Sequence, residues 1–441
     1  MKRWILFAVV LIPFVLSGQE ENKFGIKFSG FVKTDMFFDS RQTVDARLGH
    51  FLLYPANEAL DDNGDDINAR HKFNILAIQT RLTGKITGPD ALGAKTSGLI
   101  EGAFFGNIAT DINGFRLRHA FINLDWEKAS LRVGQFWHPM FVTSCFPGTV
   151  SFNTGAPFQP FARNPQIRFT QKLGKMNIIA TAMEQVDFTD GGPVGSTPRY
   201  LINNGFPELN LRLEYQTDEF LFGVGGNYKS LLPRMAINNA NDEFGYASTF
   251  KTDETVAGTS AFGYLKYKTD PLTFKLYGVY GQLLQSMTML GGYAEKEITT
   301  REVEIVSPGP GPVEPVYETT GISYTPVSTM SGWVDVHTNG KTWQVGLFGA
   351  YSQNLGAADS VSIDGEFYSR GSDIEYAYRL APRLIYNNGK FRIAPEIEYT
   401  VASYMTIDED TGEANIDEKG KITGSKEIAN FRFLLGLYYF F

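Results

Sequence analysis

Stretches in which apolar and polar side chains alternate recur along almost the whole chain, and this pattern restricts the fold more than any other feature of the sequence. In residues 209–216 (LNLRLEYQ) the apolar positions alternate with Asn, Arg, Glu and Gln, and residues 374–386 and 391–401 repeat the pattern. A period of two residues is typical of a β-strand with one apolar and one polar face. Each stretch spans about ten residues, the length of a tilted strand that crosses a membrane.

The connections between these stretches alternate between short and long. Short turns, most of which contain the Gly, Asn, Asp or Pro of a chain reversal, are predicted near residues 88–90, 127–128, 173–175, 217–218, 268–271, 339–341 and 387–390. Long connections are predicted at residues 39–68, 107–114, 138–165, 188–206, 230–253, 286–322, 353–371 and 405–425. Seven turns and eight long connections join sixteen strands. We therefore expect an all-β fold, a transmembrane antiparallel β-barrel of about 16 strands, with the long loops outside.

Composition excludes the main alternatives to a barrel. Only 20% of the 441 residues are charged and 14% are aromatic, and a chain with so many aromatic residues can bury enough apolar surface to avoid disorder. After the N-terminus no apolar stretch approaches the roughly 20 residues that a membrane-spanning helix needs. Cys145 is the only cysteine, so neither an intramolecular disulfide nor a cysteine-based metal cluster is expected.

The first 18 residues are typical of a secretory signal peptide. A basic start, MKR, precedes an apolar stretch at residues 4–16, and Ser17 and Gly18 supply small residues for cleavage before Gln19. A retained membrane anchor is the alternative, but the apolar stretch is shorter than about 20 residues and contains a proline. We predict export, cleavage after residue 18, and a single barrel domain over residues 19–441.

The end of the chain carries the same alternation to its last residue. Residues 431–441 place Phe, Leu or Tyr at every second position, opposed by Arg432 and Gly436, and Phe441 is the final residue. A terminal strand with a final Phe resembles the recognition signal that the barrel insertion machinery reads in outer-membrane proteins. The alternative is a strand that merely ends in aromatic residues.

Two neighbouring motifs carry a resemblance to a known family. Residues 116–121 (RLRHAF) are followed by residues 131–136 (LRVGQF), which lead into the long connection at residues 138–165. This pairing resembles the Gram-negative outer-membrane porin superfamily, most closely the DcaP-like porins and their Bacteroidota relatives. In sixteen-stranded porins the connection after the fifth strand folds into the barrel and narrows the pore, so the resemblance implies an in-folded constriction loop at residues 138–165.

The composition of residues 138–165 departs from that of general porins. The loop has no Asp or Glu, so the usual field between loop acids and wall arginines is not expected. A loop this apolar is costly to leave in water, and we expect it to fold inward or pack against another subunit. The candidate constriction residues are Phe141, Phe146, Phe152, Phe158, Phe161 and Arg163.

The polar faces of the strands predict the residues that line the lumen. If the aromatic face contacts lipid, the opposite face places charged side chains inside, where they are tolerated. The candidate pore-lining residues are Arg116, Arg118, Arg132, Arg168, Arg212, Arg379, Arg383, Arg392, Arg432, Glu214, Glu375, Glu396 and Glu398. The same phase puts His119 and Asn123 on the outer face, which suggests that this strand contacts another subunit. Alternatively, the arginines only form ion pairs that hold the wall together.

Other candidate sites are weaker. The five His residues are scattered and form no zinc-hydrolase motif, and the runs at residues 258–262 and 223–226 lack the rest of a catalytic or dinucleotide motif. The acidic cluster at residues 61–66 suggests either a calcium site or, more simply, a solvated turn. Cys145 suggests either a reactive thiol or a small residue packed among Phe side chains. We expect no catalytic residue, no metal, no cofactor and no nucleic-acid partner.

Two functions remain as hypotheses. The first is an outer-membrane porin, a homotrimer in outer-membrane lipid that passes small polar solutes passively. Its selectivity is expected to favour anions, because residues 70–175 hold thirteen basic against five acidic side chains, whereas residues 57–68 and 286–322 are acidic. The second is a closed barrel that serves as a structural or scaffolding subunit of an outer-membrane complex, with its acidic loops as the binding surface. A loop at residues 138–165 that seals the lumen would favour the second.

Overall fold

A computed structural model describes residues 24–106, 109–239, 247–303 and 316–441. Sixteen antiparallel strands form a closed barrel, as the sequence predicts. The strand that begins the barrel, β1, pairs with the last one, β23, from Phe31↔Phe440 to Asp39↔Arg432, and this pairing closes it. The predicted signal peptide and its cleavage site lie outside the described residues.

The barrel strands follow one another around the wall in chain order. They are β1 (Gly25–Asp39), β5 (Arg81–Thr87), β6 (Lys95–Phe104), β7 (Phe115–Asp125), β8 (Ala129–Trp137), β9 (Arg163–Leu173), β10 (Met176–Met183), β11 (Glu208–Gln216), β12 (Phe220–Leu231), β15 (Val256–Lys268), β16 (Leu272–Gln282), β18 (Val316–Thr338), β19 (Trp343–Ala357), β21 (Ile374–Asn388), β22 (Phe391–Met405) and β23 (Ser425–Phe440). All seven predicted turns fall between consecutive barrel strands, because their Gly, Asn, Asp and Pro residues are local signals.

Shorter elements lie within the long connections. They are β2 (Thr43–Ala46), β3 (Phe51–Pro55), η1 (Ile67–Ala69), β4 (Lys72–Leu76), η2 (Ala109–Asp111), α1 (Arg199–Asn204), β13 (Ala236–Asn239), β14 (Ser248–Lys251), η3 (Gln285–Met287), β17 (Gly291–Val303) and β20 (Phe367–Arg370). No helix in the described residues is long and apolar enough to span a membrane.

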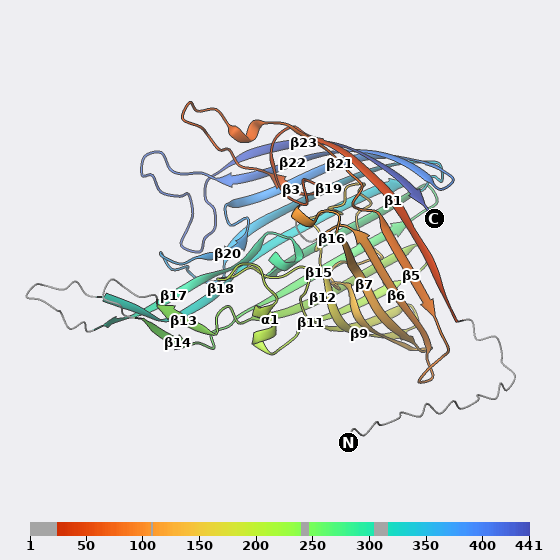
Figure 1. Ribbon diagram of the computed structural model, residues 1–441, viewed down its shortest axis with the longest axis horizontal. Coiled ribbons are helices and arrows are strands. Elements are labelled where there is room, and N and C mark those ends of the chain that lie inside the picture. Colours follow the sequence, from red (N-terminus) through yellow and green to blue (C-terminus); the bar gives the residue numbers. More distant parts are fainter. Residues whose placement is uncertain (1–23, 107–108, 240–246, 304–315) are drawn as a thin grey trace, which may run out of the picture.

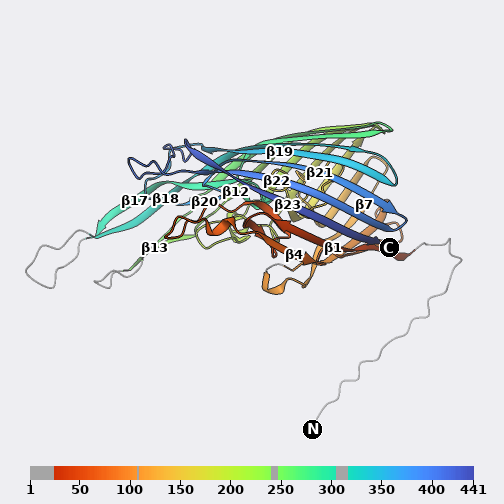
Figure 2. The same cartoon turned by 90° about the horizontal axis from the view of Figure 1, so that it is seen from above.

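The two ends of the barrel differ, as Figures 1 and 2 show. The short turns and the C-terminus lie at one end, and the long connections lie at the other. There the β17–β18 hairpin reaches beyond the wall, with the β13–β14 hairpin beside it (Figure 1). The side chain of Asn239 joins the two hairpins, because it exchanges hydrogen bonds of 2.8 and 3.0 Å with the backbone of Thr319.

The two faces of the wall differ in chemistry. Along β11, Leu209, Leu211 and Leu213 are exposed on the outer face, while Arg212 and Glu214 are buried on the inner face. The same alternation continues through β23 to its end. A continuous outer face of exposed Leu, Ile, Val and Phe is the surface that a lipid bilayer covers, and the polar inner face needs water or protein partners.

Three long connections fill part of the barrel interior. Residues 51–54, residues 138–162 and residues 283–290 are largely buried and share hydrophobic clusters with inner-face residues of the wall. The prediction that residues 39–68 and 286–322 are simply external loops is therefore wrong for residues 51–54 and 286–290. Their apolar side chains are the reason, because FLLY at residues 51–54 and MTML at residues 287–290 are costly to leave in water.

Candidate functional site

Residues 138–162, the inner loop, connect β8, the fifth barrel strand, to β9. The loop leaves the wall beside β11, where the ring of His138 lies 3.0 Å from Glu208 and Arg212 donates to the carbonyl oxygen of Pro139. It then contacts the opposite wall, where Ser331 on β18 donates to the carbonyl oxygen of Phe158 at 3.0 Å. Arg379 on β21 donates to the carbonyl oxygen of Ala156 at 2.9 Å. The inner loop thus contacts strands from both sides of the barrel.

A carboxylate on β22 holds the middle of the inner loop. The two oxygens of Glu396 accept hydrogen bonds of 2.8 Å from the backbone amides of Val150 and Ser151. Lys33 on β1 donates to the carbonyl oxygen of Val150, also at 2.8 Å. Glu398, two residues further along β22, accepts a hydrogen bond from Asn153. Each of these polar groups is buried, so breaking the contacts would leave unsatisfied groups inside the protein.

The aromatic side chains of the inner loop form much of the interior core. Phe141, Phe152, Phe158 and Phe161 are buried, whereas Phe146 is 38% exposed. Phe152 stacks on Phe105 with ring centroids 4.1 Å apart, and the ring centroid of Phe51 lies 5.6 Å from that of Phe152. The apolar composition that sets this loop apart in the sequence is thus accommodated by packing inside the barrel.

Arg163, at the start of β9, is part of an ion-pair bridge that joins two wall strands to a long connection. Its guanidinium lies 2.8 Å from one oxygen of Asp187, and Arg116 lies 3.0 Å from the other. Burial raises the pKa of Asp187, but Arg163 and Arg116 lower it more, so the net pKa lies below its ordinary value. Because Asp187 belongs to the connection between β10 and β11, the bridge fixes this connection to the end of the inner loop.

A cavity of about 400 Å³ remains between the inner loop and the wall of β1 and β5–β8, and we call it the constriction cavity. Its wall side carries Arg81, Glu101, Arg118 and His119, and its loop side carries Phe and Thr side chains with Trp137. Glu101 lies 2.9 Å from Arg118 and 3.5 Å from Arg81. The Nη1 atom of Arg118 is buried and has no hydrogen-bond partner in the structure as described.

A β-bulge corrects the predicted orientation of His119 and Asn123. Glu101 pairs with His119 but Gly102 pairs with Leu117, so Arg118 is an extra residue in β7. The bulge changes the phase of the strand. His119 therefore points inward, is 4% exposed and lines the constriction cavity, while Ile122 is 61% exposed on the outer face. Asn123, next to Ile122, follows the phase of His119, and the predicted subunit contact at this strand loses its basis.

Arg132 and Arg168 stand side by side on the inner face of β8 and β9. They are register partners, and neither forms an ion pair with any carboxylate in the described part of the chain. Both stack on the ring of Phe136, with guanidinium carbons 4.2 and 5.4 Å from the ring centroid. Arg168 also donates to the carbonyl oxygen of Trp137. Thus no carboxylate in the described part of the chain contacts either guanidinium.

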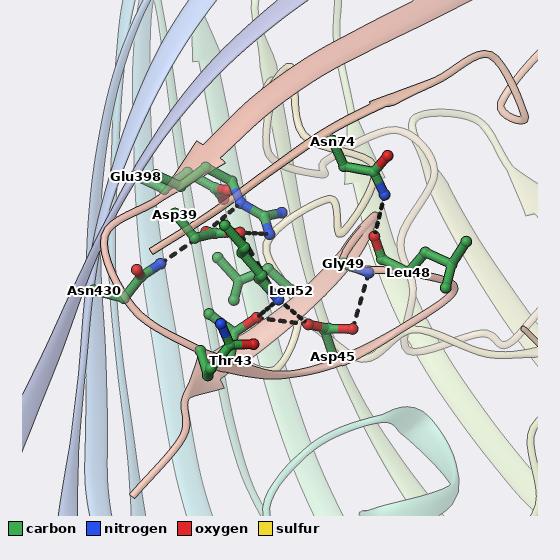
Figure 3. A network of polar contacts seen from close by, with 12 residues as sticks. Asp39, Thr43, Asp45, Leu48, Gly49, Leu52, Asn74, Glu398 and Asn430 are labelled. Carbon is green, nitrogen blue, oxygen red and sulfur yellow. Dashed lines mark hydrogen bonds and ion pairs between the residues drawn. The ribbon is translucent and has the colours of Figure 1, made fainter. Parts of the chain in front are cut away.

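The arginines of the opposite wall are paired. Arg432 binds Asp39 through two hydrogen bonds of 2.8 and 2.7 Å, and Figure 3 shows Asp39, the last residue of β1, beside Asn430, with Glu398 nearby. Arg383 lies 2.8 Å from Asp335. These two pairs join wall strands to one another, whereas Arg379, Glu396 and Glu398 connect β21 and β22 to the inner loop.

The remaining predicted lumen residues have mixed positions. Arg212 and Glu214 are buried, 3.8 Å apart. Arg392 donates to Asn387 and stacks over Phe440. Glu375 does not share the interior, because a register shift between Ile374 and Tyr376 changes the phase of β21 and leaves Glu375 bonded to Ser425 at the outer rim. That the inward arginines and glutamates line a conducting pore stays a prediction.

Sequence reasoning missed several residues that build the site. Lys33, Asp35 and Asp39 alternate along β1 and are buried, and Asp35 bridges Lys33 at 3.0 Å and His50 at 2.9 Å. The alternation of charges in residues 33–39 was a usable signal. Arg81 and Glu101 carried a weaker one, because each shares its strand with only one other charged residue, Lys85 in β5 and Lys95 in β6.

The weaker candidate sites favour their simpler interpretations. Asp61 accepts hydrogen bonds from the backbone amides of Asn63 and Asp65, as in a solvated turn. No group of three or more His, Cys, Asp or Glu suited to a metal occurs within residues 24–106, 109–239, 247–303 and 316–441. Cys145 is buried and its thiol donates to the carbonyl oxygen of Leu265.

Comparison with known proteins shows similarity in structure. No protein-family model matches the sequence, and no curated protein matches it either. The outer membrane channel DcaP of Acinetobacter baumannii is 14% identical over 97% of this chain and 100% of its own, with a TM-score of 0.61. The anion-selective porin from Comamonas acidovorans is 12% identical over 95% of this chain and 100% of its own, with a TM-score of 0.51.

A trimer form of OmpT, an outer membrane protein of Vibrio cholerae, is 10% identical over 95% of this chain and 99% of its own, with a TM-score of 0.51. The similarity to Bacteroidota porins stays a prediction. At these identities the similarity concerns the fold alone, and by that measure the chain has the sixteen-stranded barrel fold of DcaP and other outer-membrane porins.

Proposed function

We propose that the protein is an outer-membrane porin that lets small polar solutes diffuse through a water-filled passage beside the inner loop. The constriction cavity carries this proposal, because it leaves about 400 Å³ between the inner loop and the charged wall. An apolar outer face and a polar inner face are what a barrel with an aqueous lumen requires. The similar fold of a solved outer membrane channel supports the same function.

The proposal includes a preference for anions. Arg132 and Arg168 have no carboxylate partner in the described structure, and Arg118 keeps a free donor atom beside the constriction cavity. Arginine binds carboxylates through two parallel hydrogen bonds, so small organic acids suit this wall. The low effective dielectric of a narrow passage strengthens the attraction. One structural neighbour is described as an anion-selective porin, which agrees with the charge pattern.

Several further parts of the proposal follow from the barrel. We infer that the chain is exported through a cleaved signal peptide, that Phe441 contributes to recognition by the insertion machinery, and that the mature barrel is a homotrimer in the outer membrane. Phe441 lies beside β1, where its backbone exchanges hydrogen bonds with Gly30. A trimer form of a protein with this fold supports the oligomer. The channel needs no cofactor and performs no catalysis.

The scaffold hypothesis has one observation in its favour. Residues 51–54, the inner loop and residues 283–290 occupy much of the interior, and a fully sealed barrel would act as a structural subunit. The two functions differ in conductance. The full mature chain, folded and inserted in a planar bilayer in KCl, should show discrete single-channel openings if it is a porin. A folded barrel that inserts without discrete openings would contradict the porin function and support the scaffold.

A further inference from the structure

A second cavity lies among the long connections, at the end of the barrel opposite the short turns. It is lined by Tyr54 of β3, Gln285 of η3 and residues 367–371, which include β20, and by five residues of the connection between β10 and β11, namely Thr189, Gly191, Gly192, Gly195 and Ser196. We call it the vestibule cavity. Its volume of about 400 Å³ falls in the range of small-molecule sites. Unlike the constriction cavity, it is built from the long connections alone.

The lining of the vestibule cavity is polar and carries a single charge. Arg370 is the only charged side chain among the residues that line it. Hydroxyl groups come from Tyr54, Thr189, Ser196 and Ser369, and Gln285 adds an amide, whereas the hydroxyl of Tyr368 is already bonded to Arg234 and Glu295. Gly191 and Gly195 leave the backbone open to a ligand, whereas Gly192 packs against Tyr200 and Tyr293. The lining therefore offers one cation and many neutral hydrogen-bonding groups.

Arg370 has no polar partner among the described residues. No hydrogen bond or ion pair links its guanidinium to another residue in the described part of the chain, and its Nε atom is shielded from solvent. Tyr54 is only 5% exposed, and although burial raises its pKa, Arg370 is near enough to lower it in part. Asp373 also raises the pKa of Tyr54, but in the described structure it forms no ion pair with Arg370. A partly shielded cation without a counterion is an anion-binding group.

The neutral groups restrict the kind of anion. One guanidinium can bind one carboxylate through two parallel hydrogen bonds, whereas a second negative charge would find no second cation in the lining. The hydroxyl and amide groups would remain unsatisfied beside an apolar acid, at a cost of about 1–3 kcal/mol for each buried group left without a partner. The rings of Tyr54 and Phe367 offer apolar faces to the C–H groups of a ring.

We propose that the vestibule cavity binds a small polyhydroxylated monocarboxylate, such as a sugar acid, on the outer side of the inner loop. This inference rests on the proposed porin function and names a class of solute for it. Arg370 binds the carboxylate, and Tyr54, Ser196, Ser369 and Gln285 bind hydroxyl groups. The solute would occupy this site before it reaches the constriction cavity.

Binding of D-glucuronate tests the proposal. With the full mature chain in a planar bilayer, D-glucuronate added on the side of the long loops should block the current reversibly, and the concentration dependence gives an affinity. D-glucose, which lacks the charge, and butyrate, which lacks the hydroxyls, should each bind at least about tenfold more weakly, since D-glucose loses charge-assisted hydrogen bonds and butyrate loses several neutral ones. Equal binding of butyrate and D-glucuronate would overturn the proposal.

Variants of the lining provide the second part of the test. Arg370→Gln should weaken D-glucuronate binding by about tenfold or more, and Tyr54→Phe by a smaller factor, with conductance in KCl unchanged for both. Arg199→Gln is the matched control, because Arg199 is exposed on α1 at the same end of the barrel and does not line the cavity. Unchanged D-glucuronate affinity in Arg370→Gln would overturn the assignment.

Failure of this site can be told apart from failure of the porin function. A protein that conducts in KCl without any block by D-glucuronate is a porin that lacks the proposed site. For a folded barrel that does not conduct, calorimetric titration with D-glucuronate in detergent measures the site directly. Binding there that Arg370→Gln abolishes would support the site alone, and the absence of binding would overturn it.

Discussion

The inner face presents arginines in two regions, and their surroundings differ. On β8 and β9, Arg132 and Arg168 stack on an aromatic ring and have no carboxylate partner in the described structure. On β21 and β23, Arg383 and Arg432 bind Asp335 and Asp39. The alternation that places an arginine inside is the same in both regions. Whether the arginine has a carboxylate partner decides whether its charge acts on a solute or holds the wall and loops together.

Buried arginines that pair with a carboxylate are expected to contribute most to the free energy of unfolding. Arg432→Met removes the two hydrogen bonds to Asp39 and leaves that carboxylate buried, with Lys72 at 4.0 Å as the nearest remaining ion-pair partner. We expect a loss of about 3–5 kcal/mol in the free energy of unfolding. Arg168→Met breaks one hydrogen bond to Trp137 and should cost about 1 kcal/mol. Denaturant titration followed by tryptophan fluorescence measures both, and equal losses would contradict the comparison.

The inner loop separates the two regions, so its removal should change conductance. Replacing residues 141–161 by a short Gly linker removes the contacts with Glu396 and Arg379 and opens the interior. Because barrels of this size contain an aqueous channel when not filled, we expect single-channel conductance to rise by about twofold or more. Deletion of the exposed residues 409–413 is the control and should leave conductance unchanged. No rise in a correctly folded variant would show that the inner loop is not the constriction.

Selectivity should depend on the unpaired region. Replacing both Arg132 and Arg168 by Gln removes two charges that no described carboxylate balances, so the preference for anions should fall. The effect should be clearest at low salt, because the Debye length is about 30 Å at 0.01 M and about 8 Å at 0.15 M. Reversal potentials across a KCl gradient measure it, with the exposed Arg199→Gln as control. Cation selectivity of the unmodified channel would refute the proposed preference.

Local signals explain why the barrel itself could be predicted. The alternation in residues 209–216 and the turn residues at 173–175 and 387–390 act over a few positions, and each corresponds to strands and turns in the structure. The bulge at Arg118 and the register shift near Glu375 depend on how neighbouring strands pair. A single sequence does not show this pairing, so the orientations of His119 and Glu375 were predicted wrongly.

Contacts across the barrel were harder to predict than the strands. Glu396 reaches the amides of Val150 and Ser151, which lie about 245 residues earlier in the chain. Asp39 and Arg432 meet only because the first and last strands close the barrel. The charged residues on both walls of the barrel were visible in the sequence. Which arginine pairs with a carboxylate depends on how the first and last strands close the barrel and on the path of the inner loop.

The smallest expected effect concerns the bridge between Asp187, Arg116 and Arg163, which joins a long connection to the unpaired region. Burial raises the pKa of Asp187, but the two arginines lower it more, so its folded-state pKa lies below the ordinary value. A group with a lowered folded-state pKa stabilises the fold above its unfolded pKa of about 4, and this contribution disappears as the pH falls through the folded pKa. The difference in unfolding free energy between the unmodified protein and Asp187→Asn should therefore be constant above about pH 5 and shrink below about pH 4.

Exposed Asp62, which forms no ion pair in the described structure, supplies the control variant Asp62→Asn. A difference for Asp187→Asn that stays constant down to about pH 2 would mean that the bridge does not depend on the charge of Asp187.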